Sequence, residues 1–162
     1  MVERWILNAS PLIVLANTGY EGLIRQLASE FVVPHAVALE ILAGPVDDRA
    51  RLQIAGGEWP VDEAPRASEE LQTWDLGAGE TAVLSYAIAH PGWTAILDDG
   101  AARRCARTFS VQVKGSLGIV LMAKKQGLID SAASVLETLR QRGFRLDEKL
   151  ISAALKEIGE AG

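Results

Sequence analysis

Short strand-like runs alternate with helix-length segments along the chain, and this order restricts the fold more than any other feature. Strands are predicted at 4–7, 31–33, 94–97, 111–113 and 144–146. Helical segments are predicted at 10–19, 21–29, 34–44, 47–55, from 79 to a break at 90–92, 99–108, 116–127, 131–142 and from 147 onward. Parallel strands need long crossover connections, which helices usually supply. The alternation therefore predicts an α/β fold with a mainly parallel central sheet flanked by helices.

Serine, proline and glycine mark where several of these helices begin and end. Ser10 and Pro11 fit the N-cap and the first position of the helix after the first strand. Ser116 fits the N-cap of the helix that runs to Gly127. The segment 56–68 carries two prolines and no clear periodicity, so we expect an irregular flap there.

Length and composition favour one compact, cytoplasmic domain. A chain of 162 residues with 49% hydrophobic content can bury its own core, and we expect a single domain over 1–162. Cys105 is the single cysteine, which excludes an internal disulfide and a cysteine-cluster zinc site and fits a reducing cytoplasm. No apolar run is long enough to span a membrane. The net charge of −5 disfavours a broad binding surface for duplex DNA.

Acidic or near-acidic residues stand where predicted strands and helices meet. They are Asn8, Glu40, Glu80 and the Asp98-Asp99 pair. Asn8, Asp98 and Asp99 follow predicted strands, and α/β sheets bind their ligands beyond that end of the strands. Carboxylates beside a core are costly unless they are neutralised, and their oxygens suit Mg²⁺ or Mn²⁺. The pattern therefore predicts an acidic pocket whose divalent cation activates water for phosphodiester hydrolysis.

Each of these residues also has a purely structural interpretation. Asp99 fits a helix N-cap with Arg103 as its (i, i+4) partner, and Glu80 complements the positive end of its own helix. Asn8 fits an ordinary turn, and Glu40 fits a solvent-exposed helix edge despite its aliphatic neighbours. Only the combination of these positions is therefore specific.

Five segments carry this combination in order along the chain. They are Leu-Asn-Ala-Ser-Pro-Leu-Ile at 7–13, Val-Pro-His-Ala-Val-Ala-Leu-Glu at 33–40, Leu-Gly-Ala-Gly-Glu-Thr-Ala at 76–82, Leu-Asp-Asp-Gly-Ala-Ala-Arg-Arg at 97–104 and Lys-Gly-Ser-Leu-Gly at 114–118. Together they resemble the successive motifs of PIN domains, and the chain looks closest to a bacterial and archaeal branch similar to VapC toxins. The resemblance implies a three-layer α/β fold, a Mg²⁺- or Mn²⁺-dependent ribonuclease activity, and a homodimer paired with a small antitoxin.

Carried over to this chain, the resemblance implies catalytic and metal-binding roles for Asn8, Glu40, Glu80, Asp98 and Asp99. Asn8 stands where the family has its first aspartate, and an amide brings no negative charge and cannot act as a base. The further acid expected just after Asp99 is also missing, because 100–102 is Gly-Ala-Ala. The amide at position 8 predicts weaker cation binding.

Basic residues next to the acidic positions are candidates for holding an RNA backbone. They are Arg103, Arg104, Arg107 and Lys114, with Ser116 as a further polar contact. Solvated helix surface is the alternative interpretation of the basic residues. Single-stranded RNA or a structured RNA loop fits better than a duplex, because the backbone must bend into a deep pocket.

A second class of function remains open, in which the loss of the first acid leaves a PIN-like module that binds nucleic acid or protein without catalysis. Two apolar stripes are then candidate interfaces for a second subunit or an antitoxin. One lies on the last helix, at Leu150, Ile151, Ala154, Leu155 and Ile158, and the other surrounds Leu117, Val120 and Leu121. Packing of the last helix against its own domain is the simpler explanation of the first stripe.

Overall fold

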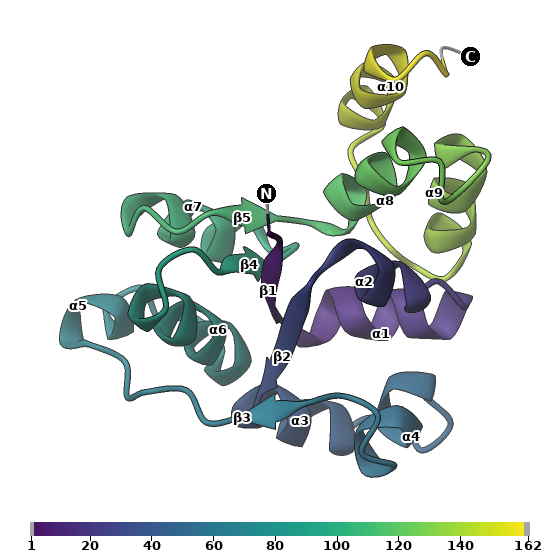
Figure 1. Ribbon diagram of the computed structural model, residues 1–162. Helices are drawn as coiled ribbons and strands as arrows, with labels where there is room; N and C mark the ends of the chain where they lie inside the picture. The colour runs from purple at the N-terminus through teal and green to yellow at the C-terminus, as the bar shows by residue number, and fades with distance from the viewer. Residues whose placement is uncertain (1, 161–162) are drawn as a thin grey trace.

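The computed structural model describes residues 2–160 and contains a five-stranded, all-parallel sheet (Figure 1). The strands are β1 (Arg4–Leu7), β2 (Glu30–Pro34), β3 (Val61–Asp62), β4 (Thr94–Ile96) and β5 (Val113–Lys114). The helices are α1 (Ala9–Thr18), α2 (Gly22–Leu27), α3 (His35–Leu42), α4 (Arg49–Ala55), α5 (Glu69–Gln72), α6 (Ala78–Ala89), α7 (Gly100–Thr108), α8 (Ser116–Lys125), α9 (Ala132–Gln141) and α10 (Glu148–Glu157).

Helices cover both faces of the sheet, which makes three layers. Figure 1 shows α5, α6 and α7 on one side of the strands and α1, α2, α8 and α9 on the other. The strand order is β3-β2-β1-β4-β5. Connections that leave β1 and β4 therefore run in opposite directions along the sheet, and right-handed crossovers then place their helices on opposite faces. The predicted α/β fold with a parallel sheet is confirmed.

The connections that follow β1 and β4 lead away from each other along the sheet. A crevice is therefore expected between the carboxyl ends of these two strands. These two strands pair in register, with Leu7 opposite Ile96. The backbone N–H of Asn8 extends this pairing by donating to the carbonyl of Ile96 over 3.2 Å. Asn8 and the Asp98-Asp99 pair are consequently placed at the same edge of the sheet.

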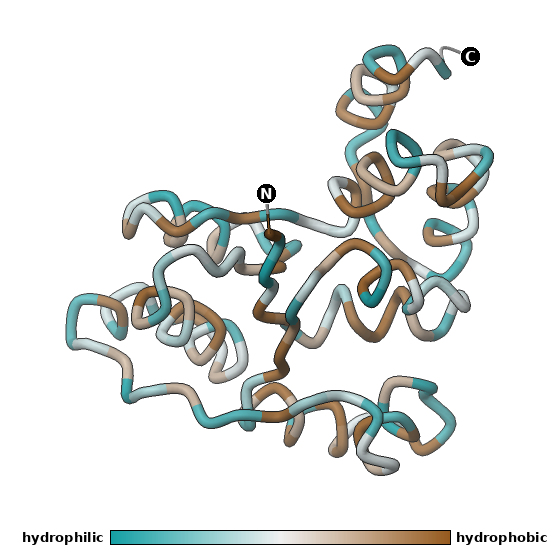
Figure 2. The backbone as a smooth tube through the Cα atoms, in the orientation of Figure 1, coloured by the Kyte–Doolittle hydropathy of each residue, from teal (hydrophilic) through white to brown (hydrophobic). Residues whose placement is uncertain are grey.

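The central strands are buried on both faces, because helices pack on each side of them. Trp5, Ile6 and Leu7 of β1 are fully buried, as are Ile96 and Leu97 at the end of β4. Figure 2 shows hydrophobic colour along the central strands and hydrophilic colour at many turns and helix ends. Strands of this kind carry continuous apolar runs instead of an alternating pattern, as the sequence does at these positions.

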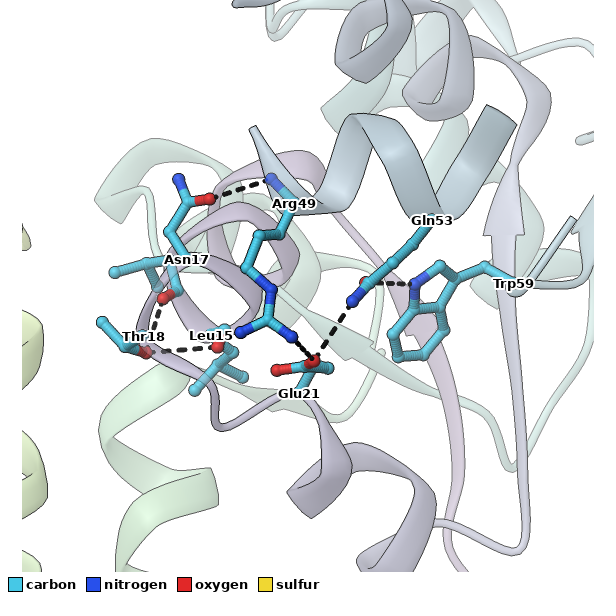
Figure 3. Close-up of polar contacts among 8 residues, drawn as sticks. Leu15, Asn17, Thr18, Glu21, Arg49, Gln53 and Trp59 are labelled. Carbon is cyan, nitrogen blue, oxygen red and sulfur yellow. Dashed lines mark hydrogen bonds and ion pairs between the residues drawn. The ribbon is translucent and has the colours of Figure 1, made fainter. Parts of the chain in front are cut away.

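A polar network fastens the turn between α1 and α2 to α4 (Figure 3). The Glu21 carboxylate accepts hydrogen bonds from Arg49 and from the Gln53 side chain, both over 3.1 Å. The Gln53 side-chain oxygen in turn accepts from the Trp59 indole over 2.9 Å. Asn17 accepts from the backbone N–H of Arg49 over 3.1 Å. The contacts of Glu21 and Asn17 join segments about thirty residues apart. The bond between Gln53 and Trp59 holds the loop after α4.

Several local predictions are wrong. The segment 144–146 is an irregular connection that pairs with no strand within residues 2–160, so the predicted strand does not form. Asn8, not Ser10, occupies the N-cap of α1, and Gly115, not Ser116, occupies the N-cap of α8. The predicted flap at 56–68 contains the edge strand β3, and the short helix α5 follows it.

The last helix packs on its own domain, as its apolar stripe suggests. Ala154 is buried, while Ile151, Leu155 and Ile158 pack against the core and Leu150 stays exposed. Of the second stripe, Val120 is fully buried, and Leu117 and Leu121 are partly covered. None of the helices within residues 2–160 has the length and apolar character needed to cross a lipid bilayer.

Candidate functional site

Asn8 is the buried polar residue at the centre of the candidate site. It occupies the N-cap position of α1, yet its side chain makes no capping hydrogen bond. The residue is only 6% exposed, and its side-chain oxygen has no hydrogen-bond partner within the described residues. An unpaired buried amide oxygen costs about 1–3 kcal/mol. This oxygen is therefore a free acceptor where the strand order predicts a ligand.

Glu40 and Gly79 lie against the Asn8 oxygen. Glu40 comes from α3, and its neighbours Val37 and Ile41 anchor that helix in the core. A Cβ placed on Gly79 would lie 3.4 Å from both the Asn8 side-chain oxygen and a Glu40 carboxylate oxygen, and 3.3 Å from Val37. The missing side chain at position 79 thus lets the first turn of α6 approach both oxygens closely.

Glu80 and Asp99 complete the acidic group at two helix N-termini. Glu80 lies in the first turn of α6, and Asp99 caps α7 by accepting from the Ala102 N–H over 3.0 Å. Burial raises the pKa of Glu80 above its ordinary value, and the neighbouring charges of Asp99 and Glu40 raise it further. The backbone N–H of Gly77 acts in the opposite direction. These carboxylates are therefore close enough to repel one another.

Asp98 points toward the start of α8 instead of standing free. Its two oxygens accept from the Ser116 backbone N–H over 2.8 Å and from the Ser116 hydroxyl over 2.7 Å. Burial still raises the pKa of Asp98, although the Ser116 bonds and the charge of Arg103 oppose that rise. A Cβ on Gly115 would lie only 2.8 Å from Asp98 and 2.7 Å from Arg103. Asp98 thus fastens the turn before α8 to the end of β4.

The residues of this acidic pocket, namely Asn8, Glu40, Glu80, Asp98 and Asp99, fit a divalent cation in chemistry. All are oxygen donors, which Mg²⁺ and Mn²⁺ prefer. No nitrogen of a Lys, Arg or His side chain in residues 2–160 lies within 4.0 Å of their carboxylates. In the same part of the chain, no three acidic, His or Cys side chains converge closely enough to enclose a metal ion. Glu40 and Asp99 are exposed, so both side chains are accessible to solvent and to a cation.

The predicted RNA-contacting residues are only partly accessible. Arg104 is exposed, whereas Arg103 is half-buried and donates to the carbonyl of Leu97 over 3.0 Å. Lys114 lies 3.7 Å from Glu3. Ser116 is fully buried and holds Asp98, so its observed contact is with the protein. Arg107, in the last turn of α7, lies at the opposite end of that helix from Asp99.

A second set of residues beside the acidic pocket was not predicted from the sequence. A hollow of about 540 Å³ is lined by Glu40 and Asp98 together with Ser10, Asn17, Arg142, Phe144 and Arg145. The last three come from the connection between α9 and α10, which packing of α9 against α1 brings to the site. The only local signal is the Arg-Gly-Phe-Arg run at 142–145, which exposes two basic side chains around an aromatic one.

Fold and site together define an α/β protein with an acidic, oxygen-rich pocket at the switch point of a parallel sheet. A family model described as a PIN domain matches residues 4–160, so the chain belongs to the PIN-domain family. A comparison with curated proteins finds no match. PIN domains have a nuclease-type fold, generally depend on divalent metal ions and are associated with nucleic-acid binding. The predicted family is confirmed, while its VapC-like branch stays a prediction.

Proposed function

We propose that this protein is a Mg²⁺- or Mn²⁺-dependent endoribonuclease that hydrolyses phosphodiester bonds of single-stranded RNA. The observation that carries the proposal is the buried oxygen of Asn8, which has no hydrogen-bond partner within residues 2–160, beside the carboxylates of Glu40, Glu80 and Asp99. Within the same residues, these three carboxylates form no ion pair with a basic side chain. Such an arrangement destabilises the free protein and is relieved by a cation. Membership of the PIN family supports a phosphodiester as the substrate.

Glu40, Glu80 and Asp99 would hold the cation, with Asn8 as a neutral fourth ligand. The bound ion supplies a Lewis acid that activates water and stabilises charge developing on the phosphate. Asp98 is a positioning residue in this scheme, because Ser116 occupies both of its oxygens. By fixing the turn before α8, Asp98 holds the end of β4 and therefore the position of Asp99.

The substrate class follows from the charge and shape of the site. The carboxylates repel a phosphate backbone in the absence of a cation, so binding to RNA depends on the ion and on nearby basic residues. Arg103, Arg104 and Lys114 remain candidates for that role. An unpaired strand or an RNA loop can bend its backbone into the pocket, whereas an A-form duplex presents a stiff, continuous surface.

The test is cleavage of a labelled single-stranded RNA pool in Mg²⁺ or Mn²⁺. We expect metal-dependent cleavage by the unmodified protein, faster cleavage by Asn8→Asp and none by Asp99→Asn. Asp99→Asn is a matched control because asparagine caps a helix as well as aspartate does. Cleavage that persists in both Asp99→Asn and Glu80→Gln would show that the activity resides elsewhere.

A module without catalysis is the second candidate, and Asn8 is the observation that favours it. An amide lowers the negative charge available to a cation and cannot take a proton from water. This candidate predicts that RNA or a protein partner binds while neither the unmodified protein nor Asn8→Asp cleaves RNA.

We further propose a cytoplasmic, homodimeric toxin that a small antitoxin neutralises. Exposed apolar side chains support an interface, among them Leu150 on α10. Light scattering after size exclusion tests the dimer, and a strict monomer at high concentration would contradict it. Growth arrest on expression, relieved by a small protein encoded next to the gene, would support the toxin role.

A further inference from the structure

The connection between α9 and α10 lines a hollow that it shares with Glu40 and Asp98 of the acidic pocket. Residues 142–146, called the strap below, include Phe144 and Arg145, which line two neighbouring hollows. The first hollow, of about 540 Å³, contains Glu40. The second, of about 410 Å³, contains Arg103 and Lys114. Asp98 lines both hollows, so the strap and the end of β4 lie between them.

The strap is built to hold one conformation. Gly143 follows α9 with φ +88°, a left-handed conformation that favours glycine. The N–H groups of Gly143 and Phe144 donate to the carbonyls of Arg140 and Leu139, which is the Schellman arrangement. This arrangement fixes the direction in which the chain leaves α9 and directs Phe144 toward the core.

Contacts at the far end of the strap complete the restraint. Asp147 caps α10 by accepting from the Lys149 N–H over 2.9 Å. Arg140 and Glu148 form an ion pair of 2.9 Å that joins the end of α9 to the start of α10. Glu160 then accepts from Ser131 and from the N–H of Ala132 at the start of α9. Figure 1 shows α8, α9 and α10 grouped at one side of the molecule, with the strap passing beside α8.

The exposed side chains of the strap have the chemistry of a binder of single-stranded RNA. Arg142 and Arg145 are exposed and make no ion pair or side-chain hydrogen bond within residues 2–160. Phe144 is half-buried and lies between them in the first hollow. Unpaired bases stack on aromatic side chains, and guanidinium groups bind phosphates. A preformed strap binds with a smaller loss of conformational entropy.

We infer that the strap is the RNA-positioning element of the site: Phe144 stacks on one unpaired base, and Arg142 and Arg145 hold the flanking phosphates. The inference rests on the proposed ribonuclease function and specifies its substrate as RNA with at least one unstacked base next to the cleaved bond. It also explains why two cations border an acidic pocket without forming an ion pair with it.

The experiment measures RNA binding by fluorescence anisotropy, with Ca²⁺ in place of Mg²⁺ or Mn²⁺ and intact RNA verified on a gel. Phe144→Leu should weaken binding about tenfold. The comparison is repeated on a series of RNAs, each lacking one base. On the RNA that lacks the base stacked on Phe144, Phe144→Leu and the unmodified protein should bind equally. Arg142→Gln and Arg145→Gln should each weaken RNA binding about fivefold. Each should also lower the slope of log binding constant against log salt concentration by about one, the amount expected for one lost phosphate contact.

Lys125→Gln is the matched charge control, because Lys125 is exposed about 14 Å along α8 from Ser116. It should bind RNA as the unmodified protein does. The inference is overturned if Arg145→Gln behaves like Lys125→Gln, or if the Phe144→Leu loss is the same on every abasic RNA. Where Phe144→Leu does not fold, Phe144→Trp decides: retained affinity supports stacking, and lost affinity contradicts it.

Failure of the strap and failure of the proposed function give different results. If the unmodified protein cleaves RNA with metal and all three strap variants bind RNA normally, the role inferred for the strap is wrong and the proposed function stands. An unmodified protein that neither binds nor cleaves RNA overturns both.

Discussion

Two acidic regions of this protein are built in opposite ways. Arg49 and Gln53 both donate to one carboxylate oxygen of Glu21, so a counter-charge accompanies the acid (Figure 3). The second Glu21 oxygen is buried and has no hydrogen-bond partner within residues 2–160. The acidic pocket brings Glu40, Glu80 and Asp99 together without a basic side chain within 4.0 Å of them in residues 2–160. The first arrangement stabilises the fold, whereas the second stores repulsion that a ligand must relieve.

The largest expected effect is on cleavage, in Glu80→Gln. Removing one carboxylate should lower metal-dependent cleavage about a hundredfold or more, which corresponds to roughly 3 kcal/mol of transition-state stabilisation. The melting temperature should stay the same or rise slightly, because the repulsion from Asp99 and Glu40 disappears. Cleavage rates and thermal melts of the same preparation check both parts. A lower melting temperature with normal cleavage would make Glu80 a structural acid.

Asn8→Asp should increase the repulsion in the acidic pocket and also its affinity for a cation. A negative charge at the buried position 8, beside the carboxylates of Glu40, Glu80 and Asp99, should destabilise the metal-free protein by about 2 kcal/mol. The same charge should tighten Mn²⁺ binding about tenfold. Thermal melts with and without Mn²⁺ measure the two effects on one sample. Equal stabilisation by Mn²⁺ in both proteins would place Asn8 outside the metal site.

Gly79→Ala should disturb the pocket without unfolding the protein. The new Cβ would lie 3.3 Å from the Val37 side chain and 3.4 Å from the Asn8 and Glu40 oxygens, so Val37 or the first turn of α6 must shift by a few tenths of an ångström beside the two oxygens. We expect about a tenfold loss of cleavage, because small displacements of catalytic groups are costly. Gly22→Ala is the control, since nothing lies within 4 Å of its Cβ position. It should leave cleavage unchanged, and equal losses in both variants would contradict the close approach.

Glu21→Gln makes the same chemical change as Glu80→Gln, but at an acid that is paired with an arginine instead of surrounded by other acids. It removes the charge paired with Arg49, which is half-exposed, so the free energy of unfolding should fall by about 1 kcal/mol. RNA cleavage should not change. Urea unfolding provides the measurement, and a stability equal to that of the unmodified protein would show that Arg49 contributes nothing through this pair.

The smallest effect is expected for a third acid, Glu160. The Ala132 N–H donates to its carboxylate and lowers the pKa of Glu160, while Ala133, Ser131 and Lys124 act in the same direction. An acid whose pKa falls on folding stabilises the protein above its unfolded pKa, and this contribution is lost as the pH falls through the folded pKa. The unmodified protein should therefore melt above Glu160→Gln at pH 7, and the gap should close on acidification. A gap that widens would contradict the assigned contacts.

The sequence predicts most of the elements that position the acidic pocket. The apolar runs at 4–7 and 94–97 and the Asp99 cap are visible in short stretches of sequence, and the structure contains β1, β4 and the cap at these positions. The segment 144–146 fails for a physical reason, because a strand also needs a partner, which only the tertiary structure supplies. Ser116 was expected to cap a helix, but the acceptor that its hydroxyl finds, Asp98, lies eighteen residues away.

The candidate site follows the same division. The placement of Asn8, Asp98 and Asp99 at one edge of the sheet could be predicted, since each follows a strand. Their role in a metal site stays a prediction. The close approach of Gly79 and the presence of Arg142 and Arg145 depend on how α6 and α9 pack, and no local pattern encodes that packing. The number and order of the acids are thus properties of the sequence, whereas their surroundings are properties of the fold.

The ribosome synthesises β1 long before β4, although the two strands are neighbours in the sheet. Asn8 precedes Asp99 by about ninety residues, and the strap follows later still. At about 5–20 residues per second, a growing chain carries Asn8 for roughly 5–20 s before its last acid is made. The proposed ribonuclease would therefore be inert toward the messenger and ribosomal RNA around it until most of its chain has been translated.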